Sequence, residues 1–513
     1  MSSLKAAARG NLLFCVATVA AAAVRAVAML GYPPAKFFPD SFAYLTDMMT
    51  GQPDSKRGNG YAFFLALLRP LHSFEIVTGL QALLGLVMGL AIYLVLRRRG
   101  LPAWGATLCA LPGLFDVYEI EIEHTISSDA LFCVLVTVSV ALLCFWDRPP
   151  WAAVVAAGLM TGYASTVRDV GEPLLLLVVA GMAARRMGWR RIAAAAAAGI
   201  APIAAYMIWF HSGTGQYAMN DAGAFLYGRA QAFAECPKMS PPADLRVLCD
   251  PRPPARREGI NHYVWAADQP LMELSGGASQ NEFTPAHSAM GRRFAERAIE
   301  SQPLDYAGSV ARQTLTTFDW NRVNANNADG NNMGSGSNFQ FRKTALGLGP
   351  WTKPASPAAR ATRAFGDPGF ALTRVRGPWA PFLWFYQHVY LRGPLLAAIM
   401  VIGLGGVAAG MRRKAWRESR WGGLALLPWL VGAALVILPP MTAGFSYRYV
   451  LAGVPLLCLA AGLAFTRSRR AGQVWRGLSS EARPSVNSSA GMSGVIARTT
   501  NLLRPWAANS SMR

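Results

Sequence analysis

The stretch FEIVTGLQALLGLVMGLAIYLVLRRR at residues 74–99 decides the fold class. Its apolar part is long enough to cross a bilayer as a helix, which needs about 20 mostly apolar residues. It ends in three consecutive arginines, the usual mark of a cytoplasmic helix end. Further apolar runs begin near Asn11, Leu101, Asp129, Ala152, Pro173, Ile192, Pro394, Trp421 and Tyr449. The sequence therefore predicts an α-helical polytopic membrane protein with about ten transmembrane helices.

The overall composition agrees with this class. Of the 513 residues, 53% are hydrophobic and 15% are charged, whereas soluble domains usually carry about 25% charged residues. The net charge of +21 would also suit a nucleic-acid-binding protein. The basic residues, however, lie in short clusters between apolar runs, and no basic face with interleaved aromatic residues occurs. Membrane lipid is therefore the expected partner, and nucleic acid is not.

Basic clusters in the short loops predict the orientation of the spans, because cytoplasmic loops carry an excess of Lys and Arg. With ten spans, every cluster falls on the side of Lys5 and Arg9; the clusters are Arg97–Arg99, Arg185–Arg191, Arg412–Arg420 and Arg467–Arg470. We therefore expect a multi-pass plasma-membrane protein with both termini cytoplasmic. The run after Asn11 is interpreted as a retained first helix, because no clear small-residue cleavage site follows it.

Polarity divides the chain into four segments. We expect an N-terminal transmembrane catalytic module at 1–210, with about seven spans and an outer loop at 33–73 that contains interfacial helices. The polar block at 211–376 is too long for a connector, so we expect a mixed extracytoplasmic domain there, with loops and some helix around Ala289–Thr316. A C-terminal transmembrane module with about three spans follows at 377–470. Residues 471–513 are expected to form a disordered cytoplasmic tail.

Two of the seven cysteines, Cys236 and Cys249, lie in the polar block. If that block is extracytoplasmic, we expect a disulfide between them. The remaining cysteines fall inside apolar runs, where we interpret them as packing residues; they are Cys15, Cys109, Cys133, Cys144 and Cys458.

The first outer loop contains an acid, Asp40, directly after the first predicted span and between aromatic residues. An acid at that depth is costly if it is merely buried, and a carboxylate can act as a general base. Asp40 could equally cap a short interfacial helix that starts at Ser41. The loop continues with the segment Arg57–Tyr61, whose glycines let the backbone approach a ligand closely or simply form a membrane-surface loop.

The second outer loop places glutamates at alternate positions, Glu119, Glu121 and Glu123, followed by His124. Carboxylates in this pattern could bind a divalent cation or orient a hydroxyl group, or they could be solvated at the surface. A divalent cation is the one cofactor that the sequence brings into consideration.

Arginines at the outer ends of two spans are candidates for phosphate binding. Arg168 stands beside Asp169, and Arg448 stands between Tyr447 and Tyr449. A guanidinium group binds phosphate oxygens in a bidentate fork and keeps its charge in a poorly hydrated site. The alternative is an aromatic membrane anchor with a snorkelling arginine.

These short motifs, taken together and in order, resemble those of bacterial GT-C-fold glycosyltransferases. The nearest group is the polyprenyl-phosphate-sugar-dependent family related to protein O-mannosyltransferases and to the aminoarabinose transferase of lipid A. The resemblance extends over about Asn11–Phe465, and the long insert with two cysteines looks like that of actinobacterial members. The motifs that carry it are Pro39-Asp40-Ser41 with Tyr44, Arg57–Tyr61, Glu123-His124 through Ser128, and Phe445–Tyr449.

The resemblance implies a GT-C-like fold and a reaction. Asp40 would act as general base on an acceptor hydroxyl, which attacks the anomeric carbon of a polyprenyl-phosphate sugar with inversion. The sugar would be mannose or arabinofuranose, and the acceptor an extracytoplasmic glycan, lipid or protein. One departure is that Ser41 stands where many relatives carry a second acid. The other implied roles are donor-phosphate binding by Arg448, Arg168 and Tyr447, acceptor or cation orientation by Glu121, Glu123 and His124, and loop support by Tyr44, Arg57 and Tyr61.

Other function classes remain open at this point. A transporter or flippase of a lipid-linked intermediate would also need charges within the membrane, although we see no related halves with broken helices. An O-antigen ligase or polymerase would rely on Arg and His in a large outer loop, where Arg256 and His262 occur. A receptor-like scaffold is a third class. If the protein is a transferase, we expect Asp40, Glu123 and Arg448 to face one outward cavity. If it is a transporter, we expect polar residues to line a path across the bilayer.

Overall fold

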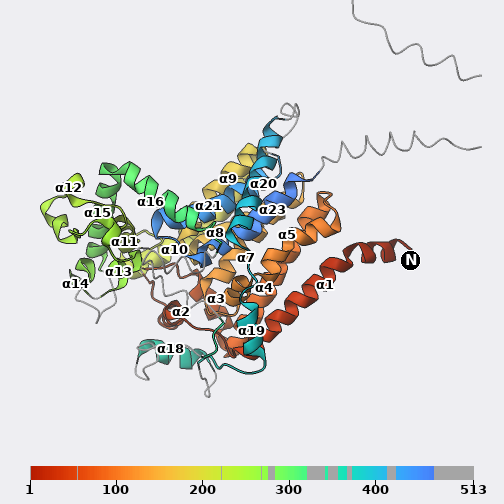
Figure 1. Ribbon diagram of the computed structural model, residues 1–513, viewed down its shortest axis with the longest axis horizontal. Coiled ribbons are helices and arrows are strands. Elements are labelled where there is room, and N and C mark those ends of the chain that lie inside the picture. Colours follow the sequence, from red (N-terminus) through yellow and green to blue (C-terminus); the bar gives the residue numbers. More distant parts are fainter. Residues whose placement is uncertain are drawn as a thin grey trace, which may run out of the picture. The chain divides into compact units, whose positions relative to one another are not determined.

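The protein is nearly all helical in the parts of the chain that the structure describes (Figure 1). The structure is a computed structural model. It describes residues 2–54, 56–220, 222–266, 268–274, 284–320, 341–344, 356–366, 372–412 and 423–466. Within these ranges no strand forms, and the isolated bridge of β type pairs Lys36 with Thr125. The predicted tail at 471–513 lies outside the described residues.

Helices of the N-terminal part include both long apolar helices and short connecting ones. They are α1 (Ser2–Gly31), α2 (Pro39–Thr50), α3 (Gly60–Leu68), η1 (Arg69–Leu71), α4 (Phe74–Arg98), α5 (Ala103–Phe115), α6 (Val117–Glu123), α7 (Ser128–Phe145), α8 (Trp151–Val167), η2 (Asp169–Gly171), α9 (Leu174–Ala184) and α10 (Trp189–Thr214).

The remaining helices fall into a polar set and an apolar set. The polar set is α11 (Gly223–Gln231), α12 (Cys236–Met239), η3 (Ala243–Leu248), η4 (Pro254–Arg256), α13 (Ile260–Trp265), α14 (Pro270–Leu274), α15 (Pro285–Ser301) and α16 (Pro303–Thr316). After it come α18 (Pro357–Phe365), α19 (Trp379–Tyr386), α20 (Gly393–Arg412), α21 (Leu426–Thr442), α22 (Tyr447–Leu451) and α23 (Val454–Ala464).

Among the described residues, six helical segments are long and apolar enough to cross a membrane, so the predicted multi-pass class is confirmed. They are Asn11–Gly31, Phe74–Arg98, Ser128–Phe145, Trp189–Thr214, Gly393–Met411 and Tyr447–Ala464, and four shorter apolar helices accompany them. The count of about ten spans stays a prediction. The run predicted near Pro173 forms α9, whose 11 residues rise only about 16 Å, which is less than the hydrocarbon thickness of about 30 Å.

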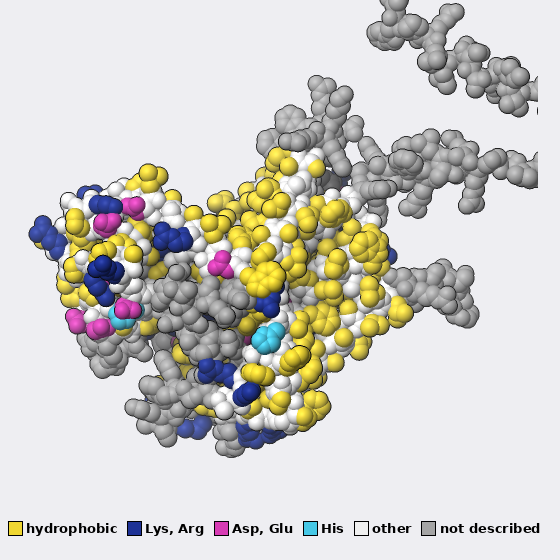
Figure 2. Space-filling model, viewed as in Figure 1, with side chains coloured by type: hydrophobic (Ala, Val, Ile, Leu, Met, Phe, Trp, Pro, Cys, Tyr) yellow, Lys and Arg dark blue, Asp and Glu magenta, His cyan; other side chains and the backbone are white. Residues whose placement is uncertain are grey.

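Two spans lie deepest in the molecule, α7 and the continuous α22–α23 segment. In their most apolar windows 78% and 83% of residues are buried inside the protein, against 17% for α10 and for α20. On the face shown in Figure 2, hydrophobic side chains cover α1, α5 and α20, while acidic and basic side chains gather over α12–α15. The first residues of α7 and α22 are therefore held by the best-packed part of the protein.

Small residues let α8 and α10 approach closely. An added Cβ at Gly162 would lie 2.0 Å from the carbonyl oxygen of Gly199, and one at Gly158 would lie 2.3 Å from that of Ala195. Glycine at such crossings is a known device of membrane helix packing. The close contact fixes the end of α8, from which Arg168 follows.

The helices α11 to α16 build a second, smaller core, and we call residues 222–320 the polar lobe. Tyr227, Tyr263 and Phe294 are buried in this core. α15 and α16 provide the helix expected around Ala289–Thr316, so the mixed character of this block is one of helices and loops. The expected boundaries at 210 and 376 stay predictions, and residues 2–466 belong to one compact unit.

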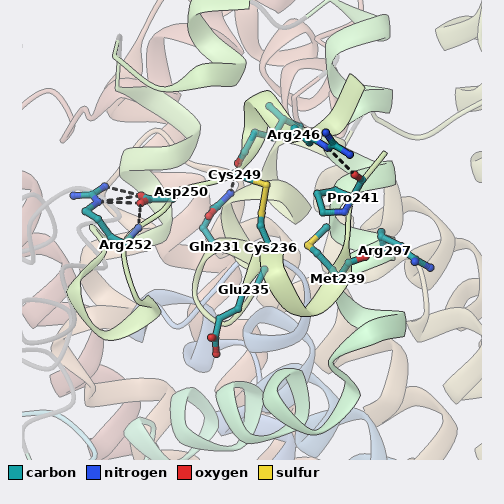
Figure 3. The surroundings of a disulfide bond; sticks show 12 residues. Gln231, Glu235, Cys236, Met239, Pro241, Arg246, Cys249, Asp250, Arg252 and Arg297 are labelled. Carbon is teal, nitrogen blue, oxygen red and sulfur yellow. Dashed lines mark hydrogen bonds and ion pairs between the residues drawn. A yellow bond between two sulfur atoms is a disulfide. The ribbon is translucent and has the colours of Figure 1, made fainter. Parts of the chain in front are cut away.

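A disulfide joins Cys236 at the start of α12 to Cys249 after η3 (Figure 3). Next to it, the Gln231 side chain donates to the carbonyl of Leu248 at 2.9 Å. Beyond Cys249, the Asp250 carboxylate accepts from Arg252. The bond therefore closes a loop in the middle of the polar lobe.

We predict that removing the disulfide loosens the polar lobe. The bond joins residues 13 positions apart, and loops of this length are stabilised by about 3 kcal/mol. In the variant Cys236→Ser with Cys249→Ser, proteolysis within 222–320 should therefore become markedly faster at equal protease. Reductant should accelerate cleavage of the parent protein and leave the variant unchanged; equal cleavage of both proteins without reductant contradicts the prediction.

Candidate active site

The carboxylate of Asp40 lies between two arginines. Asp40 is in the first turn of α2, where its Oδ1 is 3.1 Å from Arg57 Nη1 and its Oδ2 is 3.2 Å from Arg448 Nη2. The sequence left open that Asp40 caps a helix, but it is the Ser41 hydroxyl that accepts from the N–H of Phe38 at 3.1 Å. Ser41 also donates to the carbonyl of Ile126 at 2.7 Å. The Asp40 carboxylate therefore does not cap the helix and contacts the two guanidinium groups instead.

A second acid, Asp129, joins the same group from the start of α7. Its Oδ1 pairs with Arg168 Nη1, and its Oδ2 is 3.5 Å from Arg448 Nη1. Ser127, the residue before α7, caps the helix by accepting from the N–H of Asp129. Asp129 was not among the site residues predicted from the sequence. Its signal was an acid in the first turn of a spanning run, which is costly unless paired.

We call Asp40, Arg57, Asp129, Arg168 and Arg448 the arginine–aspartate cluster. Its members come from α2, the loop after α2, α7, the residue that ends α8, and α22. Segments distant in the sequence thus meet at one point, at the ends of the two best-buried spans. A cluster assembled from so many elements holds its charges in fixed positions.

Aromatic rings surround the cluster. The Tyr449 ring centroid is 4.8 Å from the Arg168 guanidinium and 5.0 Å from that of Arg448, and the Phe38 ring is 5.1 Å from Arg448. On the Asp40 side, the Arg57 guanidinium lies 5.7 Å from the Tyr44 ring. These contacts favour the guanidinium groups in a poorly hydrated place through cation–π attraction.

Two further residues selected from the sequence, Tyr44 and Tyr61, support this side of the site. The Tyr44 hydroxyl is hydrogen-bonded to Ser128 at 2.9 Å. The Tyr61 ring packs edge-on against Tyr44 with centroids 5.1 Å apart, and its hydroxyl donates to Gln81 at 2.7 Å. The structure therefore brings Tyr44, Tyr61 and Arg57 together near Asp40, and their role in loop support stays a prediction.

Within the arginine–aspartate cluster, Asp40 is accessible to solvent and Asp129 is buried. The Asp40 side chain is 27% exposed and that of Asp129 is 3% exposed. Burial raises the pKa of Asp40, but the charges of Arg57 and Arg448 outweigh burial and hold that pKa below its usual value. Asp40 is therefore ionised at neutral pH, accessible, and able to accept a proton.

A neighbouring acid on α2 has the opposite electrostatic environment. Burial and the charge of Asp54 raise the pKa of Asp47 to about 8. One helix thus carries an ionised carboxyl at Asp40 and a largely protonated one at Asp47. Contrasting environments of this kind are how proteins give two carboxyl groups different roles.

The structure places Glu121, Glu123 and His124 in a separate group, the glutamate cluster. Glu123 accepts from Arg25 through both oxygens, at 2.6 and 2.7 Å, and Glu121 pairs with Lys36. His124 Nε2 is hydrogen-bonded to the carbonyl of Tyr32 at 2.8 Å. The three side chains are 1% to 3% exposed. Their contacts favour a structural role over the acceptor or cation orientation expected from the sequence.

Tyr447 lies on the side of the glutamate cluster. Its ring packs on that of Tyr118 of α6 with centroids 4.7 Å apart, and it is 1% exposed. Of the residues expected to face one cavity, the structure brings Asp40 and Arg448 together and pairs Glu123 with Arg25 instead.

The described residues contain no group of three or more His, Cys, Asp or Glu side chains placed to hold a metal ion. The oxygens of Asp40 and Asp129 contact guanidinium groups, and those of Glu121 and Glu123 contact Lys36 and Arg25.

We predict that the pair of Arg25 and Glu123 stabilises the fold. Because each single variant, Arg25→Met or Glu123→Leu, leaves one buried charge without its partner, it should lower the free energy of unfolding by about 3–5 kcal/mol. The double variant should recover most of that loss. Thermal unfolding in detergent measures all four proteins. A double variant as unstable as the sum of the singles would show that the two residues do not act as a pair.

No protein-family model and no curated protein matches the chain. Solved structures similar to it include the S. cerevisiae protein O-mannosyltransferase Pmt1–Pmt2 complex bound to the sugar donor. The two chains are 18% identical, the match covers 45% of this chain and 36% of the yeast chain, and the TM-score is 0.32. The Archaeoglobus fulgidus oligosaccharyltransferase in the apo form is 12% identical, with coverages of 92% and 52% and a TM-score of 0.38. ArnT from Cupriavidus metallidurans bound to undecaprenyl phosphate is 13% identical, with coverages of 93% and 82% and a TM-score of 0.34.

These solved proteins are GT-C glycosyltransferases, the group that the sequence motifs resemble. The chain spans 36% of the yeast chain and 52% of the archaeal chain. TM-scores of 0.32 to 0.38 are too low to establish a reaction or a substrate for this protein, because a similar fold does not imply a similar function.

Proposed function

We propose that this protein is a membrane glycosyltransferase that moves a sugar from a polyprenyl-phosphate donor to a hydroxyl group of an extracytoplasmic acceptor. The observation that supports this most is the position of Asp40, which is accessible, ionised and held 3.1 Å and 3.2 Å from two guanidinium groups. It supports the proposal because the reaction requires a proton acceptor next to a group that binds phosphate, and guanidinium groups bind phosphate.

The donor would be bound through its phosphate and its lipid chain. Arg448 lies at the start of the apolar α22–α23 segment and Arg168 directly follows α8, so a phosphate at their guanidinium groups leaves an attached prenyl chain in the hydrocarbon layer. Guanidinium groups bind phosphate oxygens in a bidentate manner. The combination of an anionic head and an apolar tail is what a polyprenyl-phosphate sugar provides.

The reaction then proceeds as one displacement. The acceptor oxygen forms a bond to the anomeric carbon while the bond from that carbon to the phosphate oxygen breaks. Asp40 takes the hydroxyl proton, and the polyprenyl phosphate leaves with the electron pair of the broken bond. Attack from the side opposite to the phosphate inverts the configuration at the anomeric carbon.

Arg448 is suited to stabilise this displacement because its guanidinium group is shared. It contacts Asp40 before the reaction, at 3.2 Å. As Asp40 takes up the proton it loses its negative charge, while negative charge grows on the leaving phosphate. A fixed cation between the two places stabilises the charge where it develops, which is usually the largest contribution to catalysis.

The site would lie on the outer face of the plasma membrane, with both termini cytoplasmic. The support for this orientation is the distribution of basic residues: Arg97–Arg99 lie at the C-terminal end of α4, and Arg185–Arg186 follow α9. Cytoplasmic loops carry the excess of positive charge. The donor sugar is expected to be mannose or arabinofuranose, as the motif resemblance implies.

We predict that Asp40→Asn abolishes transfer. An amide cannot accept the proton, and loss of a general base lowers rates about 10²- to 10⁴-fold. The measurement is transfer of radiolabelled sugar from a polyprenyl-phosphate donor in membranes with equal protein. Asp47→Asn is the matched control on the same helix, because a largely protonated carboxyl resembles an amide in charge and shape.

Two results would count against the proposal. Equal transfer by wild type and Asp40→Asn would remove Asp40 from the mechanism. Absence of transfer by wild type with both mannose and arabinose donors would favour a transporter of lipid-linked intermediates instead.

We predict that Arg57→Gln moves the acid limb of the pH–rate profile to higher pH. Transfer needs ionised Asp40, so activity falls as the pH decreases through the pKa of this group. Arg57, together with Arg448 and Arg168, lowers that pKa; without Arg57 the pKa rises and the loss of activity begins at a higher pH. Arg293→Gln, an exposed arginine of the polar lobe paired with Asp244, is the control. An unshifted acid limb in Arg57→Gln would refute the electrostatic assignment.

A further inference from the structure

The end of α21 is held by the polar lobe. The last carbonyl groups of a helix have no partner within it. Pro439 O is bonded by the N–H groups of Ala443 and Gly444, at 2.9 and 2.8 Å. The next two carbonyls are bonded by side chains of the polar lobe: Arg229 Nε donates to Pro440 O at 2.6 Å, and the Tyr306 hydroxyl donates to Met441 O at 3.1 Å.

The same lobe also holds the residue that follows the turn. The N–H of Phe445 donates to Gln313 Oε1 at 3.1 Å. Tyr306, Ser309 and Gln313 recur on α16 at the spacing that puts side chains on one face of a helix. Ser309 in turn accepts from Arg229 Nη1 at 3.0 Å. One face of α16 and one buried arginine of α11 therefore hold the end of α21 and Phe445 in the turn that follows it.

This turn leads directly to the arginine–aspartate cluster. Gly444 has a φ of 145°, which glycine adopts far more readily than other residues. Four residues later, Arg448 contacts Asp40 and Asp129, at 3.2 and 3.5 Å. With so short a connection, a displacement of the turn displaces the Arg448 guanidinium as well.

Arg229 is unusual in how it is buried. It is 1% exposed, and its partners in the described part of the chain are a carbonyl, the Ser309 hydroxyl and the Tyr306 ring, whose centroid is 5.8 Å away. Burial lowers the pKa of Arg229 to about 10. A buried cation without a carboxylate partner is costly, and the negative end of the α21 dipole offsets only part of that cost.

We infer that Arg229 is a positioning residue for the proposed phosphate site, and that the polar lobe, through Arg229, Tyr306 and Gln313, sets the position of Arg448. The inference rests on the proposed function, in which Arg448 binds the donor phosphate. It gives the polar lobe a part in donor binding although the lobe supplies no residue to the arginine–aspartate cluster.

The test measures binding of undecaprenyl phosphate to the purified full-length protein in detergent. Loss of one such hydrogen bond changes an equilibrium by about 1 kcal/mol or more, which is about fivefold. Arg229→Met should therefore raise the Kd by about fivefold to tenfold, and Arg229→Lys, which keeps a donor for Pro440 O, should restore part of the affinity. Tyr306→Phe keeps the ring and removes one bond, so it remains informative if Arg229→Met does not fold.

Arg257→Met is the matched control. The Arg257 guanidinium bonds the carbonyls of Gln231, Ala234 and Asp250 inside the polar lobe and does not reach α21. A general loosening of the lobe should affect this variant as much as Arg229→Met. We expect the Kd to rise with Arg229→Met and with Tyr306→Phe. With Arg257→Met the Kd should stay within twofold of wild type, which is less than the change of about fivefold expected for the loss of one hydrogen bond.

The outcomes separate this inference from the proposed function. If wild type binds undecaprenyl phosphate and Arg448→Met weakens binding, but Arg229→Met and Tyr306→Phe bind no worse than Arg257→Met, the inference alone is overturned. If wild type neither binds undecaprenyl phosphate nor transfers sugar, the proposed function fails and the inference fails with it. A raised Kd in the Arg229 and Tyr306 variants, with partial recovery in Arg229→Lys, supports it.

Discussion

A buried carboxylate is costly unless a cation lies close by, and the contacts of Asp129 in this protein follow from that constraint. Asp129, which is 3% exposed at the start of α7, contacts Arg168 after α8 and Arg448 at α22. Without both arginines the acid would lie unpaired at the end of a well-packed span. The ends of α7, α8 and α22 are thereby held together, and the position of Arg448 relative to Asp40 depends on this contact.

The two clusters use the same constraint differently. In the glutamate cluster each acid is matched with its own cation and nearly inaccessible, as in the pair of Glu123 with Arg25. In the arginine–aspartate cluster, Arg448 is shared by two acids and Asp40 by two arginines. In the arginine–aspartate cluster, an arginine can contact a further anion and still keep one of its carboxylate partners. In the glutamate cluster, a cation could contact a further anion only by losing its single carboxylate partner. This difference, together with the exposure of Asp40, is why we place chemistry at one cluster and stability at the other.

The sequence predicted the membrane class because long apolar runs are a local property, and it selected Asp40, Arg57 and Arg448 because these charges stand close to aromatic residues in the predicted outer loops or at the outer end of a span. It did not select Asp129, whose partners lie on other helices. It also favoured a functional reading of Glu123, since nothing local shows that Arg25, 98 residues earlier, faces it. Apolar character likewise could not reveal that the helix α9 ends after 11 residues. Pairing across the chain is a property of the fold, and single motifs do not contain it.

The position of Arg25 has a consequence for how the protein is made. Arg25 lies within the first apolar segment, Asn11–Gly31, and its carboxylate partner is synthesised 98 residues later. A charged residue within a spanning helix is costly until it is paired, and the carboxylate that pairs with Arg25 lies at the end of α6. We therefore expect that α1 is stably placed in the bilayer only after α6 has been synthesised, so that the early helices insert together.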